Sequence, residues 1–586
     1  MQDKFQSIIE KYQVQIEQDL KTFNMLGFVK LAAVVALVVC IVFLFAGGNV
    51  AWIVFTVVLT VAVVLWIWHF RLDNKIKYAK GIVKICNEHI DRITGEWTKF
   101  EDVGREFVDF EHPYACDLDM VGPKSFFQFL NTTHTWHGRQ AFVRDLLHPT
   151  YNIADVQERQ KAIEELSQDI DFTNDVQFFL SQIGAKAQDA ELVKELSDNS
   201  PLISTANIWR FLLSYLPVIS IILLVAGAIF QMPPLYIAGS GFVVIQLILC
   251  KISGGNAAKY LGIMNRMPYK LDKYVRVIDI ITPRDFSSVK LNQIKSQLMM
   301  ASKAVKELEK IDNKLSIRAN PLIYVVFNVL LLWDFHCAFL LERWKKKYSH
   351  LAAQWFTAIG EFESLVSFSH LPKVCNNVCL PDICEDGKIF AKNLGHPLLL
   401  NSSRVNNDVQ FDNNIFIISG SNMSGKTTFM RTVGVNLLLA RAGSFVCAGE
   451  MMCTRFDIIT SMRIADDLNE GVSTFYAELR RVKQIIDQAE NPNMLFLIDE
   501  IFKGTNSVDR LAGADAVISK LSQRKAMGMV STHDLELCKL ADLHARIENH
   551  SFSEYYEHGN IFFDYKIHPG QSKTTNAKFL MEMVGI

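Results

Sequence analysis

The sequence lacks an excess of charge of either sign. Its 586 residues contain 60 Lys and Arg against 62 Asp and Glu, a formal net charge of −2. A balance of this kind excludes a basic field over the whole surface, so any contact with nucleic acid would have to come from a local patch. The length also excludes a single hydrophobic core and predicts two to four domains.

The sequence also lacks paired cysteines. The eleven cysteines are odd in number and scattered without paired spacing, which favours reduced thiols facing the cytosol over a disulfide framework. Cys375, Cys379 and Cys384 lie close together in the sequence, yet their spacings match no common zinc pattern. We interpret them as structural thiols, with a metal site as the alternative.

The N-terminus does not have the pattern of a secretory signal peptide, because no short apolar run there ends in a small-residue cleavage site. Residues 1–24 predict an amphipathic helix instead, since apolar side chains recur there at near-helical spacing. These side chains are Ile8, Ile9, Tyr12, Ile16 and Leu20.

Long hydrophobic runs are plentiful, and half of all residues are hydrophobic. Leu31–Ala46 and Val50–Trp68 are almost uninterrupted apolar segments separated by a short glycine-containing turn. Each is close to the ~20 residues that cross a bilayer core as a helix. The pattern predicts a transmembrane hairpin over residues 25–70, and two buried helices of a soluble protein are the alternative.

A second pair of apolar runs, Phe211–Phe230 and Leu235–Cys250, predicts another transmembrane hairpin. Basic residues flank the open ends of both hairpins, and the turn of the first carries no charge. The flanking residues are Lys21, Lys30, Arg71, Lys75, Lys77, Lys80, Arg210 and Lys251. By the positive-inside rule we expect four spans of the cell membrane, with both termini and all soluble parts in the cytoplasm.

A further apolar segment, Leu322–Leu341, contains Asn328, Asp334 and His336. An aspartate near mid-bilayer costs about 2.5–3.5 kcal/mol on insertion scales, so we expect a buried helix of a soluble core, with a fifth span as the alternative. The basic run Arg343–Lys347 follows it. We interpret that run as a solvated helix face, and contact with phosphate or lipid head groups is the alternative.

A glycine loop between an apolar strand and a helix predicts a phosphate cradle in the last third of the chain. Glycines at both ends let successive amides face one anion, and the following helix points its positive dipole end at the same place. Lys426 would reach the β and γ phosphates, and the Thr427 hydroxyl would ligate magnesium. The loop residues are Gly420, Ser421, Asn422, Met423, Ser424, Gly425, Lys426, Thr427 and Thr428.

The second half of such a site follows the apolar strand Met494–Ile498. Asp499 stands at the carboxyl end of that strand, where magnesium is held, and Glu500 beside it would polarise the attacking water. His533 ends a later apolar strand and could sense the γ-phosphate. A histidine alone would be interpreted as a capping or packed residue, but the presence of the two phosphate motifs favours a role in sensing the γ-phosphate. The phosphate loop and the Asp499-Glu500 pair together predict an ATPase site.

Several motifs accompany the phosphate loop: Asn422-Met423, Ser473-Thr474-Phe475, Asp499-Glu500, Gly504-Thr505, Thr532-His533, Gly570-Gln571-Ser572 with Asn576-Ala577, His396-Pro397-Leu398-Leu399, and the run from Asp117 to Leu166. In these motifs the chain, from about Asp117 onward and apart from the second hairpin, resembles the MutS family of DNA mismatch-recognition ATPases. The resemblance implies an ABC-type P-loop ATPase domain of α/β class that uses ATP and Mg²⁺. It also implies a homodimer, in which Ser473 approaches the γ-phosphate bound by the partner subunit and the loop near Asn506 lines the interface.

The chain departs from the family where mismatches are read. The family uses an N-terminal domain with a Phe-x-Glu wedge, whereas residues 1–112 here are hairpin and linker, and the DNA clamp is shortened or replaced by the second hairpin. Phe552-Ser553-Glu554 has the wedge spacing but lies inside the ATPase region. Ser421 stands where the family usually has proline and Arg510 where it has glycine, and neither change removes a phosphate or magnesium ligand.

These patterns together predict a membrane-anchored MutS-family ATPase that hydrolyses ATP as a dimer, with catalytic roles for Lys426, Glu500 and His533. The family implies DNA binding and a repair-related role. The alternative is a mechanochemical or transporter-like membrane ATPase without a nucleic-acid substrate, although the Leu-Ser-Gly-Gly-Gln signature of ABC exporters is replaced by Ser473-Thr474-Phe475.

The expected order of segments along the chain is an amphipathic helix (1–24), a transmembrane hairpin (25–70), a helical linker (71–112), the first part of a helical core (113–200), a second hairpin (201–251), the rest of the core and lever (252–371) and the ATPase domain (372–586).

Overall fold

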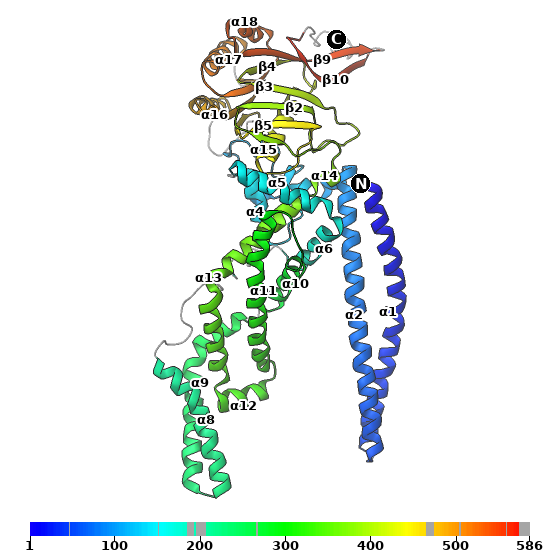
Figure 1. The fold of residues 1–586 in the computed structure, drawn as a ribbon, viewed down its shortest axis with the longest axis vertical. Helices are drawn as coiled ribbons and strands as arrows, with labels where there is room; N and C mark the ends of the chain where they lie inside the picture. Colours follow the sequence, from blue (N-terminus) through cyan, green and yellow to red (C-terminus); the bar gives the residue numbers. More distant parts are fainter. Residues whose placement is uncertain are drawn as a thin grey trace. The chain divides into compact units, whose positions relative to one another are not determined.

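The computed structural model describes residues 1–45, 47–149, 152–184, 193–194, 207–264, 268–463, 474–502, 506–557 and 560–572 (Figure 1). They form two compact units, each assembled from separate stretches of chain. The first contains Met1–Asn131, Val143–Phe178 and Val366–Ile586, and the second contains Thr132–Phe142 and Phe179–Leu365. All described strands follow Val374, which confirms the prediction of a largely helical chain with a C-terminal α/β region.

Two long helices open the first unit, α1 (Gln2–Leu44) and α2 (Asn49–Thr94), and they pack along each other. The amphipathic segment expected over residues 1–24 and the first apolar run belong to one continuous helix. Helix α2 likewise runs past its apolar segment, so much of the expected linker is part of it. Short 3₁₀ turns follow, η1 (Glu96–Lys99) and η2 (Arg105–Phe107).

Among the residues that the structure describes, four helices are long and apolar enough to cross a membrane by length and composition: α1, α2, Leu213–Phe230 and Pro233–Cys250. The most apolar stretches of α1 and α2 are almost entirely unburied, since only 6% and 0% of their residues are buried inside the structure. Nearer the rest of the unit, Leu26, Leu72 and Ile76 form a small cluster between the two helices. A fifth span would arise only if a bent helix pair around residues 289–331 counted as one.

The helical part of the first unit packs onto the α/β region through a buried ion pair. Asn152 caps α5 (Ile153–Gln168) by accepting from the Asp155 amide. The Arg159 side chain, on that helix, is 1% exposed and donates to the Ala442 carbonyl and to Asp145, each at 2.8 Å. One guanidinium therefore joins two helical segments to the end of α15 (Lys426–Arg441). The neighbouring helices are α3 (Phe126–Leu130), α4 (Trp136–Leu147), α6 (Ile170–Ser181) and α14 (Leu371–Val374).

The α/β region contains two sheets. The four-stranded sheet has the order β1 (Asp382–Cys384), β5 (Glu450–Thr454), β2 (Lys388–Leu394), β3 (Asn407–Asp412). The six-stranded sheet has the order β10 (Asn560–Pro569), β9 (Ile547–Glu557), β4 (Ile415–Ser419), β8 (Met527–Thr532), β7 (Met494–Asp499), β6 (Asp457–Ser461). Its neighbours from β9 to β6 pair in parallel, and only β10 runs antiparallel at the edge.

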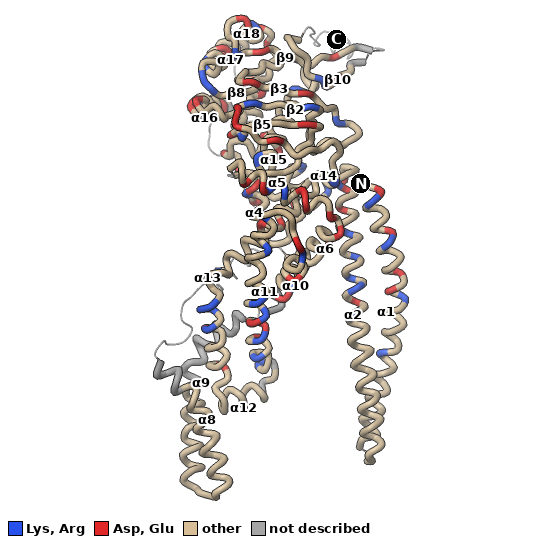
Figure 2. Tube along the Cα trace, in the orientation of Figure 1, with Lys and Arg blue, Asp and Glu red and all other residues tan. Residues whose placement is uncertain are grey.

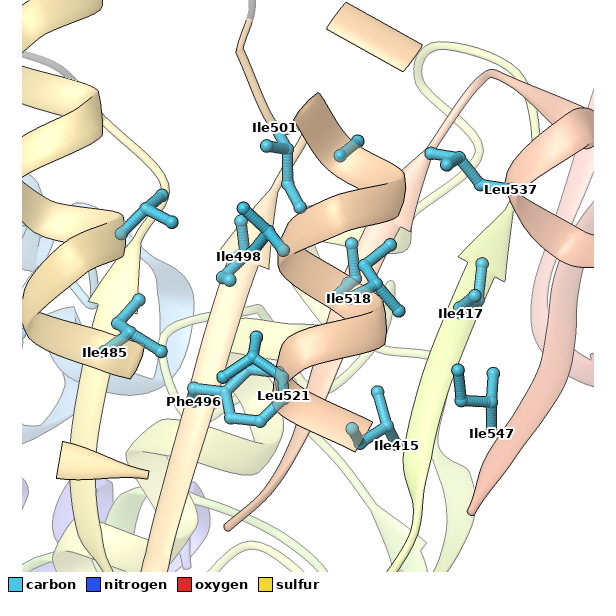
Figure 3. Close-up of a cluster of buried hydrophobic side chains, with 14 of the residues drawn as sticks. Ile415, Ile417, Ile485, Phe496, Ile498, Ile501, Ile518, Leu521, Leu537 and Ile547 are labelled. Atoms are coloured by element: carbon cyan, nitrogen blue, oxygen red, sulfur yellow. The ribbon is translucent and has the colours of Figure 1, made fainter. Parts of the chain in front are cut away.

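Alternation along β7 sends side chains to both faces of this sheet. Phe496 and Ile498 point to one face, where they pack with Ile518 and Leu521 of α17 (Figure 3). Leu497, between them in sequence, meets Gly434 on the opposite face. The helices of the region are α15 (Lys426–Arg441), α16 (Thr474–Gln488), α17 (Ser507–Ser522), η4 (Leu535–Lys539) and α18 (Leu540–Leu543).

The second unit contains a helical hairpin and a set of long helices. Its elements are α8 (Asn207–Phe230), α9 (Pro233–Met264), α10 (Pro268–Ile281), α11 (Val289–Leu315), η3 (Ser316–Ala319), α12 (Pro321–Leu331) and α13 (Trp333–Phe368). The hairpin α8–α9 carries no charged residue between Leu213 and Cys250. Within the unit, the Glu363 carboxylate caps the start of α4 by accepting from the His134 amide at 2.6 Å and from Thr135.

The prediction of one buried helix over Leu322–Leu341 is wrong. The segment breaks at Leu332, whose φ is +49°, so α12 ends at Leu331 and α13 begins at Trp333. Three apolar side chains of α12 are also exposed, Ile323 by 46%, Val325 by 56% and Val326 by 53%. The break lets buried Asp334 meet Arg318, because a straight helix would leave that carboxylate among apolar neighbours.

We expect Arg159→Met to lower the apparent free energy of unfolding by about 3 kcal/mol, because it leaves the carboxylate of Asp145 buried without its buried counter-charge. Arg144→Met is the matched control. Arg144 binds the same carboxylate at 2.9 Å, but its side chain is 45% exposed, so its loss should cost less than about 1 kcal/mol. Urea unfolding of the detergent-solubilised chain measures both, and equal losses would contradict the assignment.

Candidate nucleotide-binding site

The loop between β4 and α15 contains three residues with positive φ angles, and two of them are glycines. Gly420 and Gly425 have φ angles of +147° and +108°, and Met423 also lies in the left-handed region at +68°. A Cβ at Gly420 would approach the Phe552 carbonyl to 2.7 Å. The strand, the loop and a helix that begins at Lys426 confirm the local pattern expected from the sequence.

Lys426 is buried inside this loop. Its Nζ donates to the carbonyls of Gly420 and Ser421, both at 2.8 Å, and the residue is only 5% exposed. The ammonium group is thus held at the centre of the loop, next to the N-terminus of α15. Phosphate oxygens would be stronger acceptors for it than neutral carbonyls, so the loop can hold a polyphosphate chain.

Oxygen ligands suited to magnesium meet at the carboxyl ends of the strands. Thr427 Oγ1 donates to Asp499 Oδ2 at 3.0 Å, and the Ser531 hydroxyl donates to the other oxygen of the same carboxylate. Parallel pairing of β7 and β8 places Asp499 directly opposite Ser531. Within the described residues no three His, Cys, Asp or Glu side chains form a metal site, so Mg²⁺ here would take its other ligands from phosphate and water.

Three predicted residues from separate segments converge beside this pair. His533 Nε2 lies 2.8 Å from Asn422 Oδ1 and 2.7 Å from Glu500 Oε1. Glu500 has a φ of +56°, and its amide donates to the Ser531 carbonyl at 3.2 Å. Asp534, which follows His533, forms an ion pair with Arg510 at 3.1 Å. Arg510, where the chain departs from the family pattern, therefore has a structural role. The imidazole therefore connects the phosphate loop to the acid that would orient water.

A cavity of about 460 Å³ lies against the loop. Loop residues and Glu500 form one side, and His396, Phe552 and Tyr565 contribute aromatic rings to its wall. Burial, followed by the charges of Arg431 and Arg404, lowers the pKa of His396 to about 4, so this ring is neutral at physiological pH. The volume and the mixed lining suit the nucleoside part of a nucleotide.

Two residues beside the loop received no role from the sequence, Ser531 and Glu554. The carboxylate of Glu554, on β9, accepts from the Ser421 hydroxyl at 2.7 Å and the residue is 5% exposed. Ser531 could have been found from strand register, since it lies near the end of β8, the strand next to the one that carries Asp499. Glu554 gave no such signal, because its partner Ser421 stands where the family pattern has proline.

Other predicted residues lie outside the described residues, namely Ser473, Gly504-Thr505 and Asn576-Ala577. Asn506 is described, and its side chain caps α17 by accepting from the Asp509 amide at 2.9 Å. Ser572 donates through its amide to the Ser419 hydroxyl at 2.8 Å, which ties the chain after β10 to the strand before the loop.

Comparison with known proteins supports a relation to the MutS family. Residues 416–585 match the family model described as MutS domain V. The DNA mismatch repair protein MutS of Shouchella clausii is 32% identical over 236 residues, which are 39% of this chain and 27% of that protein. That of Pseudothermotoga lettingae is 32% identical over 262 residues, 42% of this chain and 32% of that protein. The chain thus spans about a third or less of these relatives.

We expect Glu554→Gln to tighten the binding of MgATP about fivefold, because it removes a negative charge beside the loop and keeps an acceptor for Ser421. The gain should shrink as salt is added. Glu548→Gln is the control, since Glu548 is an exposed residue of the same strand. Titration with a fluorescent ATP analogue measures both affinities, and unchanged or weaker binding in Glu554→Gln would contradict the electrostatic role.

Proposed function

We propose that the protein is a membrane-anchored ATPase of the MutS family that works as a homodimer. The observation that carries this proposal is the convergence of the phosphate loop, Asp499, Glu500 and His533 at the carboxyl ends of the parallel strands of the six-stranded sheet. Ligands bind at this edge in open α/β folds. The match of residues 416–585 to MutS domain V supports the same assignment.

Each site residue has its own role in ATP hydrolysis. Lys426 and the loop amides bind the β and γ phosphates, and Thr427 and Asp499 hold Mg²⁺. The metal supplies neutralisation of the charge on the phosphoryl oxygens. Glu500 orients the attacking water, and His533 contacts the γ-phosphate while it stays linked to Asn422. In the dimer, Ser473 of the partner subunit completes the site.

The membrane part of the proposal rests on the exposed apolar helices. The outer parts of α1 and α2 present a continuous apolar surface, with Phe28, Val42 and Val50 exposed by 76%, 65% and 73%. A surface of this extent is unfavourable in water and suits a bilayer. We propose that both hairpins span the cell membrane, with the termini and the ATPase region in the cytoplasm, and that nucleotide state moves them.

The relation to the MutS family extends the proposal to DNA. The relatives are named DNA mismatch repair proteins, and a repair-related role follows from that relation. The second candidate is a mechanochemical membrane ATPase without a nucleic-acid substrate. It is favoured by the net charge of −2 and by the apolar hairpin at the N-terminus.

We expect Glu500→Gln to lower kcat for ATP hydrolysis by about 100-fold or more while the affinity for MgATP stays within about threefold, because the carboxylate acts on water and not on binding. Lys426→Ala should remove binding instead. Phosphate release and nucleotide titration of the reconstituted protein separate the two effects. Hydrolysis at the normal rate by Glu500→Gln would refute the assignment, and Glu548→Gln serves as the unaffected control.

We expect homoduplex and mismatched DNA to bind with equal affinity, because Phe552-Ser553-Glu554, which has the spacing of the family's mismatch-reading wedge, lies inside the ATPase region. Phosphate contacts should make that affinity fall steeply with salt. Fluorescence anisotropy over a salt series measures both duplexes. A preference for the mismatch would contradict the expectation, and absence of binding at low salt would favour the ATPase without a nucleic-acid substrate.

A further inference from the structure

The bend between α12 and α13 brings an apolar helix next to the second hairpin. Helix α12 has 11 residues, about 16 Å of helix, which is too short to cross a bilayer core of ~30 Å. Leu213 and Leu216 of α8 form a cluster with Leu332 and Phe335 at the bend. If the hairpin spans the membrane, as we propose above, the bend lies at its cytoplasmic end.

A polar network fixes the shape of this bend. Arg318 donates to both oxygens of Asp334, at 3.0 and 2.8 Å, and the Tyr324 hydroxyl donates to the same carboxylate at 2.7 Å. The Asp334 amide in turn donates to the Asn328 side chain at 3.1 Å. The network joins η3, α12 and α13, so the cavity beside them has a preformed wall.

That cavity, which we call the elbow cavity, has a volume of about 800 Å³. Residues of α8, α11, α12 and α13 line it: Ser214, Lys314, Leu331, Trp333, His336, Cys337, Phe339, Leu340, Glu342, Arg343 and Lys346. All of them belong to the second unit. The described apolar part of the α8–α9 hairpin is uncharged, whereas α11 and α13 carry basic residues (Figure 2).

The charges of the elbow cavity suit an anion. Lys314, Arg343 and Lys346 line it against a single carboxylate, that of Glu342, which is buried and lies 3.9 Å from Lys346. Neither Lys314 nor Arg343 has an ion pair with any carboxylate in the described part of the chain. The expectation that Arg343–Lys347 is simply a solvated face holds only in part, because Trp344 and Lys345 are buried.

Apolar side chains also line the cavity, and Leu331, Phe339 and Leu340 lie in its wall together with the basic residues. A free phosphate ion would gain nothing from such a wall, but a molecule that carries both a phosphate and an acyl chain would use both parts. We propose that the elbow cavity binds an anionic phospholipid. Its head-group phosphate lies among Lys314, Arg343 and Lys346, and an acyl chain follows the apolar wall toward the hairpin.

The test is the binding of fluorescent phosphatidylglycerol to the full-length protein in neutral detergent. We expect the triple variant Lys314→Gln, Arg343→Gln, Lys346→Gln to lose at least about tenfold in affinity. The matched control Lys303→Gln, Lys310→Gln, Lys347→Gln removes the same charge from the same two helices outside the cavity and should stay within about twofold. Equal losses in the two triple variants would overturn the proposal.

Two further experiments test whether the bound phosphate belongs to a lipid and whether loss of binding reflects loss of charge or loss of the fold. Unlabelled phosphatidylglycerol should displace the probe, whereas glycerol phosphate and phosphatidylcholine should not; displacement by either would overturn the lipid assignment. The charge-retaining variant Lys314→Arg, Arg343→Lys, Lys346→Arg should bind within about threefold of the unaltered protein. Loss of binding in this variant, like that in the glutamine triple, would contradict a site based on charge.

The inference rests on the proposed membrane placement, and the two can fail separately. Flotation of the unaltered protein with phosphatidylcholine vesicles tests the placement alone. Failure to float would reject the membrane spans and, with them, the elbow site. Flotation together with phosphatidylglycerol binding that ignores the three basic residues would reject the elbow site and leave the membrane placement and the ATPase unaffected.

Discussion

The parallel pairing of β4, β8 and β7 is the constraint on which the site depends. It aligns Ser419 with Thr532 and Asp499 with Ser531, so the loop after β4, the acids at the end of β7 and the histidine after β8 lie at one edge. Close packing keeps this alignment, since a Cβ at Gly528 would lie 2.3 Å from the Phe496 ring. Residues more than a hundred positions apart are brought within hydrogen-bond distance by three strands.

A second constraint is the set of buried contacts between α2, which belongs to the apolar hairpin, and the segment around α14 that precedes the α/β region. Helix α2 continues without a break through His89, whose ring stacks on Phe5 at a centroid distance of 4.9 Å and contacts the His370 ring at 4.6 Å with a tilt of 49°. Burial lowers the pKa of neighbouring Lys373 to about 7, and its Nζ donates to Thr173 at 2.8 Å. Buried polar contacts of this kind tolerate little displacement, so α2 and α14 should move together.

Local patterns predicted the phosphate loop, the strand that ends at Asp499 and the helical hairpins, because each is encoded by contiguous residues. The role of Glu554 could not be predicted, since it depends on the register of β9 beside the loop. The bend at Leu332 was missed for a related reason. A hydropathy argument counts Asp334 only as an unfavourable free energy of membrane insertion. In the structure the chain bends there, and Asp334 forms an ion pair with Arg318.

The most direct test is a structure of the protein in lipid nanodiscs with MgATP and the Glu500→Gln substitution. We expect triphosphate density at Gly420–Thr428, with Lys426 Nζ turned from the Gly420 carbonyl to the phosphates. We also expect Ser473 of the partner subunit at the γ-phosphate and four helices inside the lipid belt. A loop without nucleotide, or hairpins outside the belt, would contradict a membrane-anchored ATPase.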